Sequence, residues 1–422
     1  MRAATEGIRL TVAAAGLWWR HLVPLVTVFL FGYALHLSGL GLSVRIGSAQ
    51  PVIATVVFVL AVLARVGSLV VMLWLCRPPD DHETALDVLA LAIGPFLAVY
   101  AVWGLVEDEV YALFAANIAV SGIGGVDAWS VNLQWTGRYV AMAVVAWVLR
   151  QLVGLVARRR PLRPILLAGA VLEGVWTFAS ALAVLAGLDR LVGWVTSRAF
   201  WQGLVGGWHA FLGVLPDLAL PFDLTLPEAV AELAGWLTGT LVPSVWSAIL
   251  LPLVWVALTA VVFGWRRLDA RTVVAGTALD TAHDDLLART GASRTGRLLH
   301  AGWLLVSADL RFKYLPVVGA FRLLLAAGPW FLAAYLVLAT ALETARSWAV
   351  LGVARVLGPR DQYDTLAWSW AEDLVTTLPF TTAAVALYAA AVRRALALEV
   401  DPKVTEDGTP ADRYPRRPTV AP

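Results

Sequence analysis

Long apolar runs separated by short polar segments dominate the chain and predict helices that cross a membrane. A helix needs about 20 mainly apolar residues to span a bilayer. Eight runs reach that length, at about 22–42, 52–76, 84–104, 137–157, 164–187, 241–264, 315–341 and 374–393. We therefore expect an all-α polytopic membrane protein with about eight transmembrane helices, which pair into four hairpins.

The composition agrees with this pattern. Of the 422 residues, 59% are hydrophobic and 15% are charged, whereas roughly 25% are charged in an average soluble domain. These values exclude a water-soluble globule and a disordered chain. The net charge of +2 gives no reason to expect nucleic acid as a partner. Cys76 is the single cysteine, so the chain forms no internal disulfide.

Charge differs between the two sets of loops and predicts the direction of the spans. Arginine is concentrated in 158–163, in the long loop 265–313 and at 393–394, whereas the opposite loops are richer in acids. Cytoplasmic loops carry the excess of Lys and Arg. We therefore expect a protein of the plasma membrane with both termini in the cytoplasm. The polar, proline-rich residues 395–422 are predicted to form a disordered cytoplasmic tail.

The extracytoplasmic connections after the third, fifth and seventh spans are long and rich in tryptophan. Tryptophan prefers the headgroup layer, because its ring is apolar while its N–H needs a partner. We expect interfacial amphipathic helices in these connections, and similar ones on the inner side at 5–19 and 294–310. The tryptophans concerned are Trp129, Trp135, Trp194, Trp201, Trp208, Trp236, Trp348, Trp368 and Trp370.

Two spans share a sequence pattern that suggests an internal repeat. The third span contains Gly94-Pro95 and the seventh contains Gly328-Pro329, and in each the pair opens a similar apolar run that ends in tyrosine. The inner ends of four spans also share proline next to arginine, which convergence explains equally well. Within a transmembrane bundle of residues 1–394 we expect two repeat-related hairpins and one diverged hairpin, at about 77–160, 311–394 and 161–266.

The paired Gly-Pro sequences are candidates for a substrate site. Proline inside a helix removes a backbone hydrogen bond and kinks the chain. Matching breaks in repeated spans indicate the binding site of many transporters. The alternative is that both pairs are packing kinks, since glycine and proline are common in membrane helices.

Charged residues inside the spans point to the same region. Arg65 lies near the middle of the second span and Glu173 about a third of the way into the fifth, while Arg150 and Arg322 are nearer the inner ends. Charges at such depth are costly and usually face partners or a wet cavity. We predict that Arg65 pairs with Glu173. The two further arginines favour an anionic ligand, although snorkelling to the headgroups explains them as well.

Two acidic sets lie in predicted cytoplasmic loops. Asp80, Glu83 and Asp87 form one, and Asp280 and Asp284 form the other; at these spacings one helix face collects the acids. The two sets loosely resemble the aspartate-rich motifs of UbiA-type membrane prenyltransferases, and the resemblance implies Mg²⁺ held against a diphosphate. Helix capping and a solvated helix face are the alternative explanation.

Three functions follow as hypotheses from these features. The leading one is a transporter or permease-like subunit with its site between kinked helices, lined by Arg65, Gly94, Pro95, Glu173, Arg322, Gly328 and Pro329. The second is a non-catalytic scaffold that binds envelope lipids or a partner subunit through its Trp-rich outer helices. The third is a Mg²⁺-dependent prenyltransferase; only this one needs a cofactor. No nucleotide-binding loop is present in the sequence, so an ATP-driven cycle would need a separate ATPase subunit.

Overall fold

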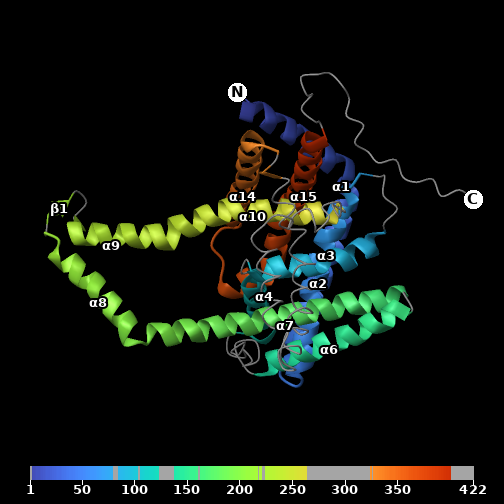
Figure 1. Cartoon of the computed structure of the whole chain (residues 1–422), viewed down its shortest axis with the longest axis horizontal. Coiled ribbons are helices and arrows are strands. Elements are labelled where there is room, and N and C mark those ends of the chain that lie inside the picture. Colours follow the sequence, from blue (N-terminus) through green and yellow to red (C-terminus); the bar gives the residue numbers. More distant parts are fainter. Residues whose placement is uncertain are drawn as a thin grey trace, which may run out of the picture.

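The protein is seen here in a computed structural model that describes residues 2–78, 84–102, 105–122, 137–159, 162–216, 218–220, 224–263, 324–325 and 327–400. These residues form eleven α-helices, one short π-helical segment and a two-stranded antiparallel ribbon (Figure 1). The first five helices are α1 (Arg2–Gly47), α2 (Pro51–Leu75), α3 (Ala85–Val102), α4 (Leu105–Ser121) and α6 (Gly137–Arg159). The remainder are α7 (Arg163–Thr196), α8 (Ala199–Val214), β1 (Ala219–Leu220), β2 (Leu224–Thr225), α9 (Leu226–Trp236), the π-helix η2 (Leu237–Leu241), α10 (Val242–Val262), α14 (Pro329–Leu357) and α15 (Gln362–Val400).

Seven helices in the described ranges are long and apolar enough to cross a membrane. They correspond to all of the predicted spans except the third, which is represented by the shorter helix α3. Because helices with this much exposed apolar surface need a lipid environment, the chain is a multi-pass membrane protein. The predicted all-helical polytopic fold is confirmed.

Helix α1 packs along both α2 and α15 in the core of the structure. Figure 1 shows α1 and α2 running along the vertical direction of the view, with the red helix α15 beside α1. The inner face of α15 is built from small residues, with Ala386, Ala389 and Ala391 fully buried. Small side chains let helix backbones approach closely, which is the usual basis of packing between membrane helices.

Glycines on α1 make the contact with α2 especially close. A Cβ atom at Gly39 would lie 2.6 Å from the Cβ atom of Ala61, and one at Gly32 would lie 2.4 Å from the Cβ atom of Ser68. Ser43 on the same face donates a hydrogen bond of 2.7 Å to the carbonyl oxygen of Ala54. The two backbones therefore approach to a distance that no larger residue would allow at these positions.

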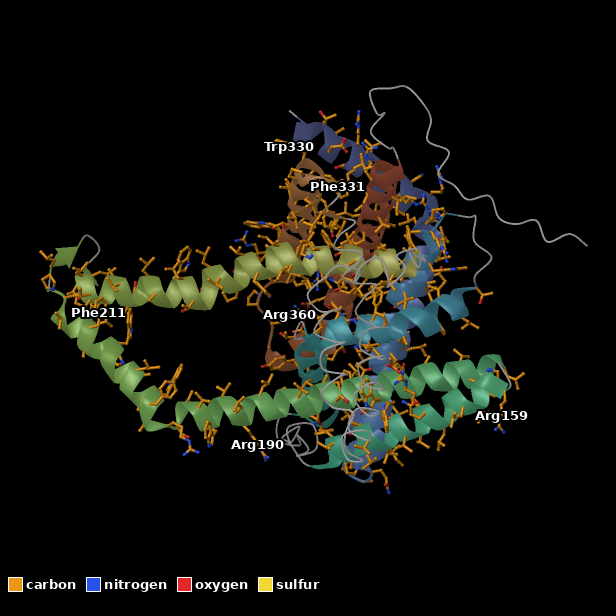
Figure 2. The ribbon with its side chains drawn as sticks, viewed as in Figure 1. Arg159, Arg190, Phe211, Trp330, Phe331 and Arg360 are labelled. Atoms are coloured by element: carbon orange, nitrogen blue, oxygen red, sulfur yellow. The ribbon has the colours of Figure 1, made fainter. Side chains whose placement is uncertain are left out.

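An apolar arm extends from this core. Helix α7 and the continuous α9–α10 rod run across the view to its left side, where α8 joins them (Figure 1). Helix α8 has no buried residue, and the side chains along it, including the labelled Phe211, point outward from the ribbon (Figure 2). These helices carry four of the nine tryptophans that the sequence placed at the membrane surface, and three of them, Trp194, Trp208 and Trp236, are well exposed.

Several boundaries differ from those expected. Helix α14 begins at Pro329 and continues to Leu357, so the predicted span 315–341 is displaced toward the C-terminus. Helix α15 continues to Val400, beyond the predicted start of the disordered tail at residue 395. Residues 5–19 are part of α1 rather than a separate interfacial helix. The predicted inner helix 294–310 and the whole loop 265–313 lie outside the described residues.

Candidate functional site

A cavity of about 630 Å³ lies among the helices of the core. Side chains from α1, α2, α3, α4, α10, α14 and α15 line it. Its wall combines apolar and aromatic residues with charged groups, among them Arg65, Asp108, Glu343 and Arg346. Small-molecule sites commonly have this size and this mixture of an apolar lining with a few polar groups.

Buried charge at one wall is centred on Glu109 of α4. The Glu109 carboxylate is fully buried, and Arg65 of α2 donates to its Oε1 atom at 3.0 Å. The Tyr100 hydroxyl of α3 donates to the same oxygen. His36 of α1 places its Nε2 atom 3.3 Å from the other oxygen, Oε2. We call His36, Arg65, Tyr100 and Glu109 the Glu109 cluster.

The close approach of α1 and α2 positions His36 in this cluster. His36 lies on α1 between Gly32 and Gly39, the two glycines that contact α2. Its Nδ1 atom is 3.2 Å from the carbonyl oxygen of Ala61, the residue that Gly39 touches. The side chain is 2% exposed, so the contacts of both ring nitrogens are fixed by protein atoms.

Arg65 connects the cluster to the cavity. Its side chain remains 41% exposed although Glu109 is completely buried, and Arg65 is part of the cavity wall. Part of the guanidinium therefore faces open space while one N–H group contacts the Glu109 carboxylate. An arginine with free donors in a cavity of low polarity is suited to bind an anionic group.

The wall near α15 adds a second carboxylate. Asp373 accepts a hydrogen bond from Thr377 at 2.8 Å, and its Oδ2 atom lies 3.1 Å from the hydroxyl oxygen of Tyr33. Tyr33 and Thr377 both line the cavity. Asp373 is near enough to interact electrostatically with His36 and Arg65.

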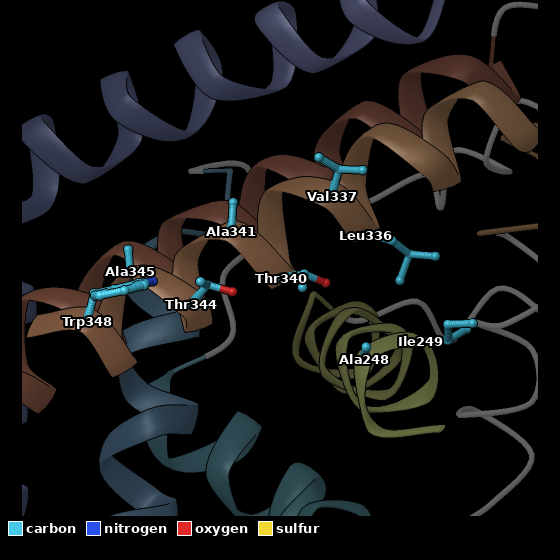
Figure 3. A pocket seen from close by; sticks show the side chains of 9 residues that line it. All are labelled: Ala248, Ile249, Leu336, Val337, Thr340, Ala341, Thr344, Ala345 and Trp348. Atoms are coloured by element: carbon cyan, nitrogen blue, oxygen red, sulfur yellow. The ribbon is translucent and has the colours of Figure 1, made fainter. Parts of the chain in front are cut away.

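A shallow apolar groove adjoins the cavity on the outside of the bundle. Figure 3 shows it between α10 and α14, with Ala248 and Ile249 on one side and the α14 residues from Leu336 to Trp348 on the other. Ala248, Thr340 and Thr344 line both the groove and the cavity. Val337 is 67% exposed, and the outer surfaces of apolar spans face lipid. The cavity is therefore bordered by a lipid-facing groove between two helices.

Arg65 and Glu173, which the sequence suggested as an ion pair, have different partners in the structure. Arg65 contacts Glu109, whereas Glu173 of α7 forms an ion pair with Arg150 of α6, so the predicted Arg65–Glu173 pair is wrong. The Arg150 guanidinium also lies over the Trp176 ring, 5.9 Å from its centre. Arg150 and Glu173 thus hold the α6–α7 hairpin together, and Glu173 is not part of the cavity wall described above.

The two Gly-Pro sequences occupy different structural positions. Gly94 and Pro95 are buried inside α3, which continues through the proline as one helix. Pro329 is exposed in the first turn of α14, where its missing N–H costs nothing, and Gly328 before it has a φ of +96° that favours glycine. Neither pair lines the cavity within the described residues. Arg322 lies outside the described residues.

The candidate magnesium ligands lie almost entirely outside the described residues. Asp80, Glu83, Asp280 and Asp284 are not described, and Asp87 lies in α3 with an undescribed side chain. The magnesium hypothesis therefore stays a prediction.

Glu109 is the functional residue that the sequence did not single out. It stands beside Glu107 and Asp108, and the three acids together indicated a polar outer loop. In the structure α4 turns Glu109 and Asn117 onto its buried face, together with Leu113. Glu109, Leu113 and Asn117 follow one another at intervals of four residues, so they share one face of a helix. This spacing is the signal in the sequence that could have identified the buried face.

Comparisons of the chain with protein-family models, with curated proteins and with solved structures found no match. The function is therefore argued from the site alone.

Proposed function

We propose that this chain is a transporter or permease-like subunit that binds an amphipathic organic anion in the central cavity. The observation that carries the proposal is the position of Arg65, which is exposed to a cavity lined mainly by apolar and aromatic side chains while Glu109 holds one N–H group of its guanidinium. An anionic group would bind the remaining guanidinium donors. An apolar tail would lie against Trp255 and Leu251, toward the lipid-facing groove.

The shape of the site supports this ligand class over a strongly hydrated solute. The groove between α10 and α14 is lined almost wholly by apolar groups and borders the cavity at three shared residues. A ligand that partitions into the bilayer could enter along this route with its tail in an apolar environment throughout. A fully polar solute would lose its hydration there without compensation.

Octanesulfonate is a suitable probe, because it is an amphipathic anion that stays charged at all accessible pH values. We expect it to raise the melting temperature of the purified protein, since a ligand that prefers the folded state stabilises it. Ethanesulfonate, which lacks the tail, and octyltrimethylammonium, which has the opposite charge, should act much more weakly. Radiolabelled octanesulfonate should also accumulate in proteoliposomes that contain the protein.

Arg65→Gln tests the assigned residue. The substitution should weaken octanesulfonate binding at least about tenfold, because a hydrogen-bonded charge is lost. Arg9→Gln is the control, since Arg9 is largely exposed at the start of α1 and pairs with Glu6. Equal binding by all three proteins, or stabilisation by the cationic probe, would contradict the proposed ligand class.

The scaffold hypothesis keeps one specific support, which is the exposed apolar arm. Helix α8 has no buried residue and carries the exposed Trp201, Trp208 and Phe211. A scaffold would bind octanesulfonate or lipid without moving it across the membrane. Binding without any uptake into proteoliposomes would therefore favour the scaffold over the transporter.

A further inference from the structure

Both ring nitrogens of His36 face hydrogen-bond acceptors. Nδ1 lies 3.2 Å from the carbonyl oxygen of Ala61, and Nε2 lies 3.3 Å from Oε2 of Glu109. A neutral imidazole has one N–H group, so one of its nitrogens would direct a lone pair at an oxygen. The Nε2–Oε2 contact has an ion-pair distance without hydrogen-bond geometry, so Oε2 accepts no hydrogen bond from the described residues, and both side chains are buried. One additional proton on this pair removes the conflict.

The surroundings of Glu109 indicate where that proton lies. Arg65 and Tyr100 both donate to Oε1 of Glu109, and donors of this kind stabilise the ionised carboxylate. On this geometry the additional proton belongs on His36, which then pairs as an imidazolium with the Glu109 carboxylate. In this state Nδ1–H faces the Ala61 carbonyl oxygen, and the charged ring lies at ion-pair distance from Oε2.

The charges around His36 are balanced when it is protonated. Arg65 from α2 and the His36 imidazolium are positive, while Glu109 from α4 and Asp373 from α15 are negative. Tyr100 from α3 and Tyr33 from α1 are the neutral titratable groups nearby, and Asp108 lies in the cavity wall. Loss of the His36 proton leaves Arg65 and Tyr100 as the donors to Glu109 and makes the wall more negative.

We infer that His36 is a proton-binding site whose occupation is coupled to anion binding at Arg65. This inference rests on the proposed function, because the coupled ligand is the anion of that cavity. A proton on His36 satisfies Glu109 and adds positive charge, which leaves Arg65 free to bind the anion. Each ligand raises the affinity for the other, as reciprocal coupling requires. Proton and anion would consequently cross the membrane in the same direction.

Nitrogen NMR of the full-length protein labelled at histidine tests the proton site without any ligand. The His36 signal is identified by its loss in His36→Gln. We expect it to report an imidazolium at about pH 5, the acid end of the range in which histidine changes its charge, and to be neutral at that pH in Glu109→Gln. His21→Gln is the matched control, since His21 is on the same helix and also contacts a carbonyl oxygen, that of Leu17. A neutral His36 throughout about pH 5 to 8 would overturn the inference.

Octanesulfonate affinity measured at two pH values tests the coupling. We expect binding at about pH 5 to be roughly tenfold tighter than at about pH 8, and this difference should vanish in His36→Gln and persist in His21→Gln. Binding that is independent of pH in the wild-type protein would overturn the coupling. Absence of any binding would instead contradict the proposed function, and the NMR result would still decide whether His36 binds the proton.

Discussion

Single charged residues have unequal energetic roles in this protein, and the difference follows from burial. The Glu109 carboxylate is completely buried and contacts three side chains from three other helices. Glu343, in contrast, is 69% exposed and pairs with Arg346 one turn along the same helix. Buried pairs leave an uncompensated charge when one partner is removed, whereas exposed pairs within a helix contribute little.

We predict that Glu109→Ala lowers the free energy of unfolding by about 2–4 kcal/mol, because Arg65 and His36 lose their shared partner. Glu343→Ala should lower it by less than about 1 kcal/mol. Both values can be measured by unfolding in mixed detergent micelles. Similar losses for the two variants would mean that the Glu109 cluster is accessible to water.

Tyr335 gives a second prediction at this scale. Its hydroxyl donates a hydrogen bond of 2.6 Å to the carbonyl oxygen of Pro252 and links α14 to α10. Tyr335→Phe should therefore lower the free energy of unfolding by about 1 kcal/mol. Tyr111→Phe is the control, because Tyr111 is 70% exposed. An unchanged stability of Tyr335→Phe in the same unfolding assay would show that water replaces the lost hydroxyl.

The sequence identified Arg65 as unusual but assigned it the wrong partner. A charged residue inside an apolar run stands out even in a single sequence. Burying a charge in the bilayer is energetically costly, so such residues are rare. Its partner depends on which helices pack together, and that information is not local. Glu109 lies 44 positions from Arg65 and looked like one of three loop acids.

At the scale of helices, the contact between α1 and α2 places the His36 ring next to the Ala61 carbonyl oxygen and Glu109. Gly39 and Ala61 are in direct contact, and the Ala61 carbonyl oxygen is the partner of His36. A side chain at Gly39 would separate the two helices at this point. The stability of the helix pair and the geometry of the Glu109 cluster are therefore coupled.

We predict that Gly39→Ala lowers the free energy of unfolding by about 1–3 kcal/mol, because its Cβ atom would overlap Ala61. Gly41→Ala, two residues further on, should be neutral or stabilising by up to about 1 kcal/mol. No atom lies within 4 Å of a Cβ atom at Gly41, and alanine favours the helix over glycine. Equal effects of the two substitutions would rule out the close contact.

Most helices could be predicted from apolar run length, but their ends could not. The predicted second span 52–76 agrees closely with α2, because a proline and a polar turn mark its start. The seventh span was misplaced because Gly328-Pro329 was interpreted as a break inside a helix. The same two residues begin α14, and proline is equally acceptable in a first turn.

At the scale of the whole molecule, the apolar arm indicates how the chain sits in the bilayer. Its helices expose Trp208, Phe211 and Trp246 to the surroundings, and such a surface is stable only against lipid or another protein. The turn after α1, in contrast, exposes Ser48 and Gln50. The two regions should differ sharply in their access to water.

Cysteine labelling tests this difference. Native Cys76 is buried and should not react. In cells that express the protein, a membrane-impermeant maleimide should label Ser48→Cys, since the predicted orientation puts this turn outside. Phe211→Cys should be labelled only after detergent removes the lipid. Labelling of Phe211→Cys in intact membranes would place the arm in water, and failure to label Ser48→Cys would reverse the predicted orientation.

The attachments of α15 have a consequence for movement. Arg394 pairs with Glu6 of α1 at 3.0 Å, Arg393 donates to the Cys76 carbonyl oxygen after α2, and Tyr33 contacts Asp373 further along. Within the described residues, α14 packs on α1, α15 and α10 and is joined to α10 by the Tyr335 bond. Helices α1, α2 and α15 are therefore joined by polar contacts near both ends of α15. If the proposed transport cycle requires the cavity to open, these attachments would keep the three helices together, and His36 would stay in place while other helices move.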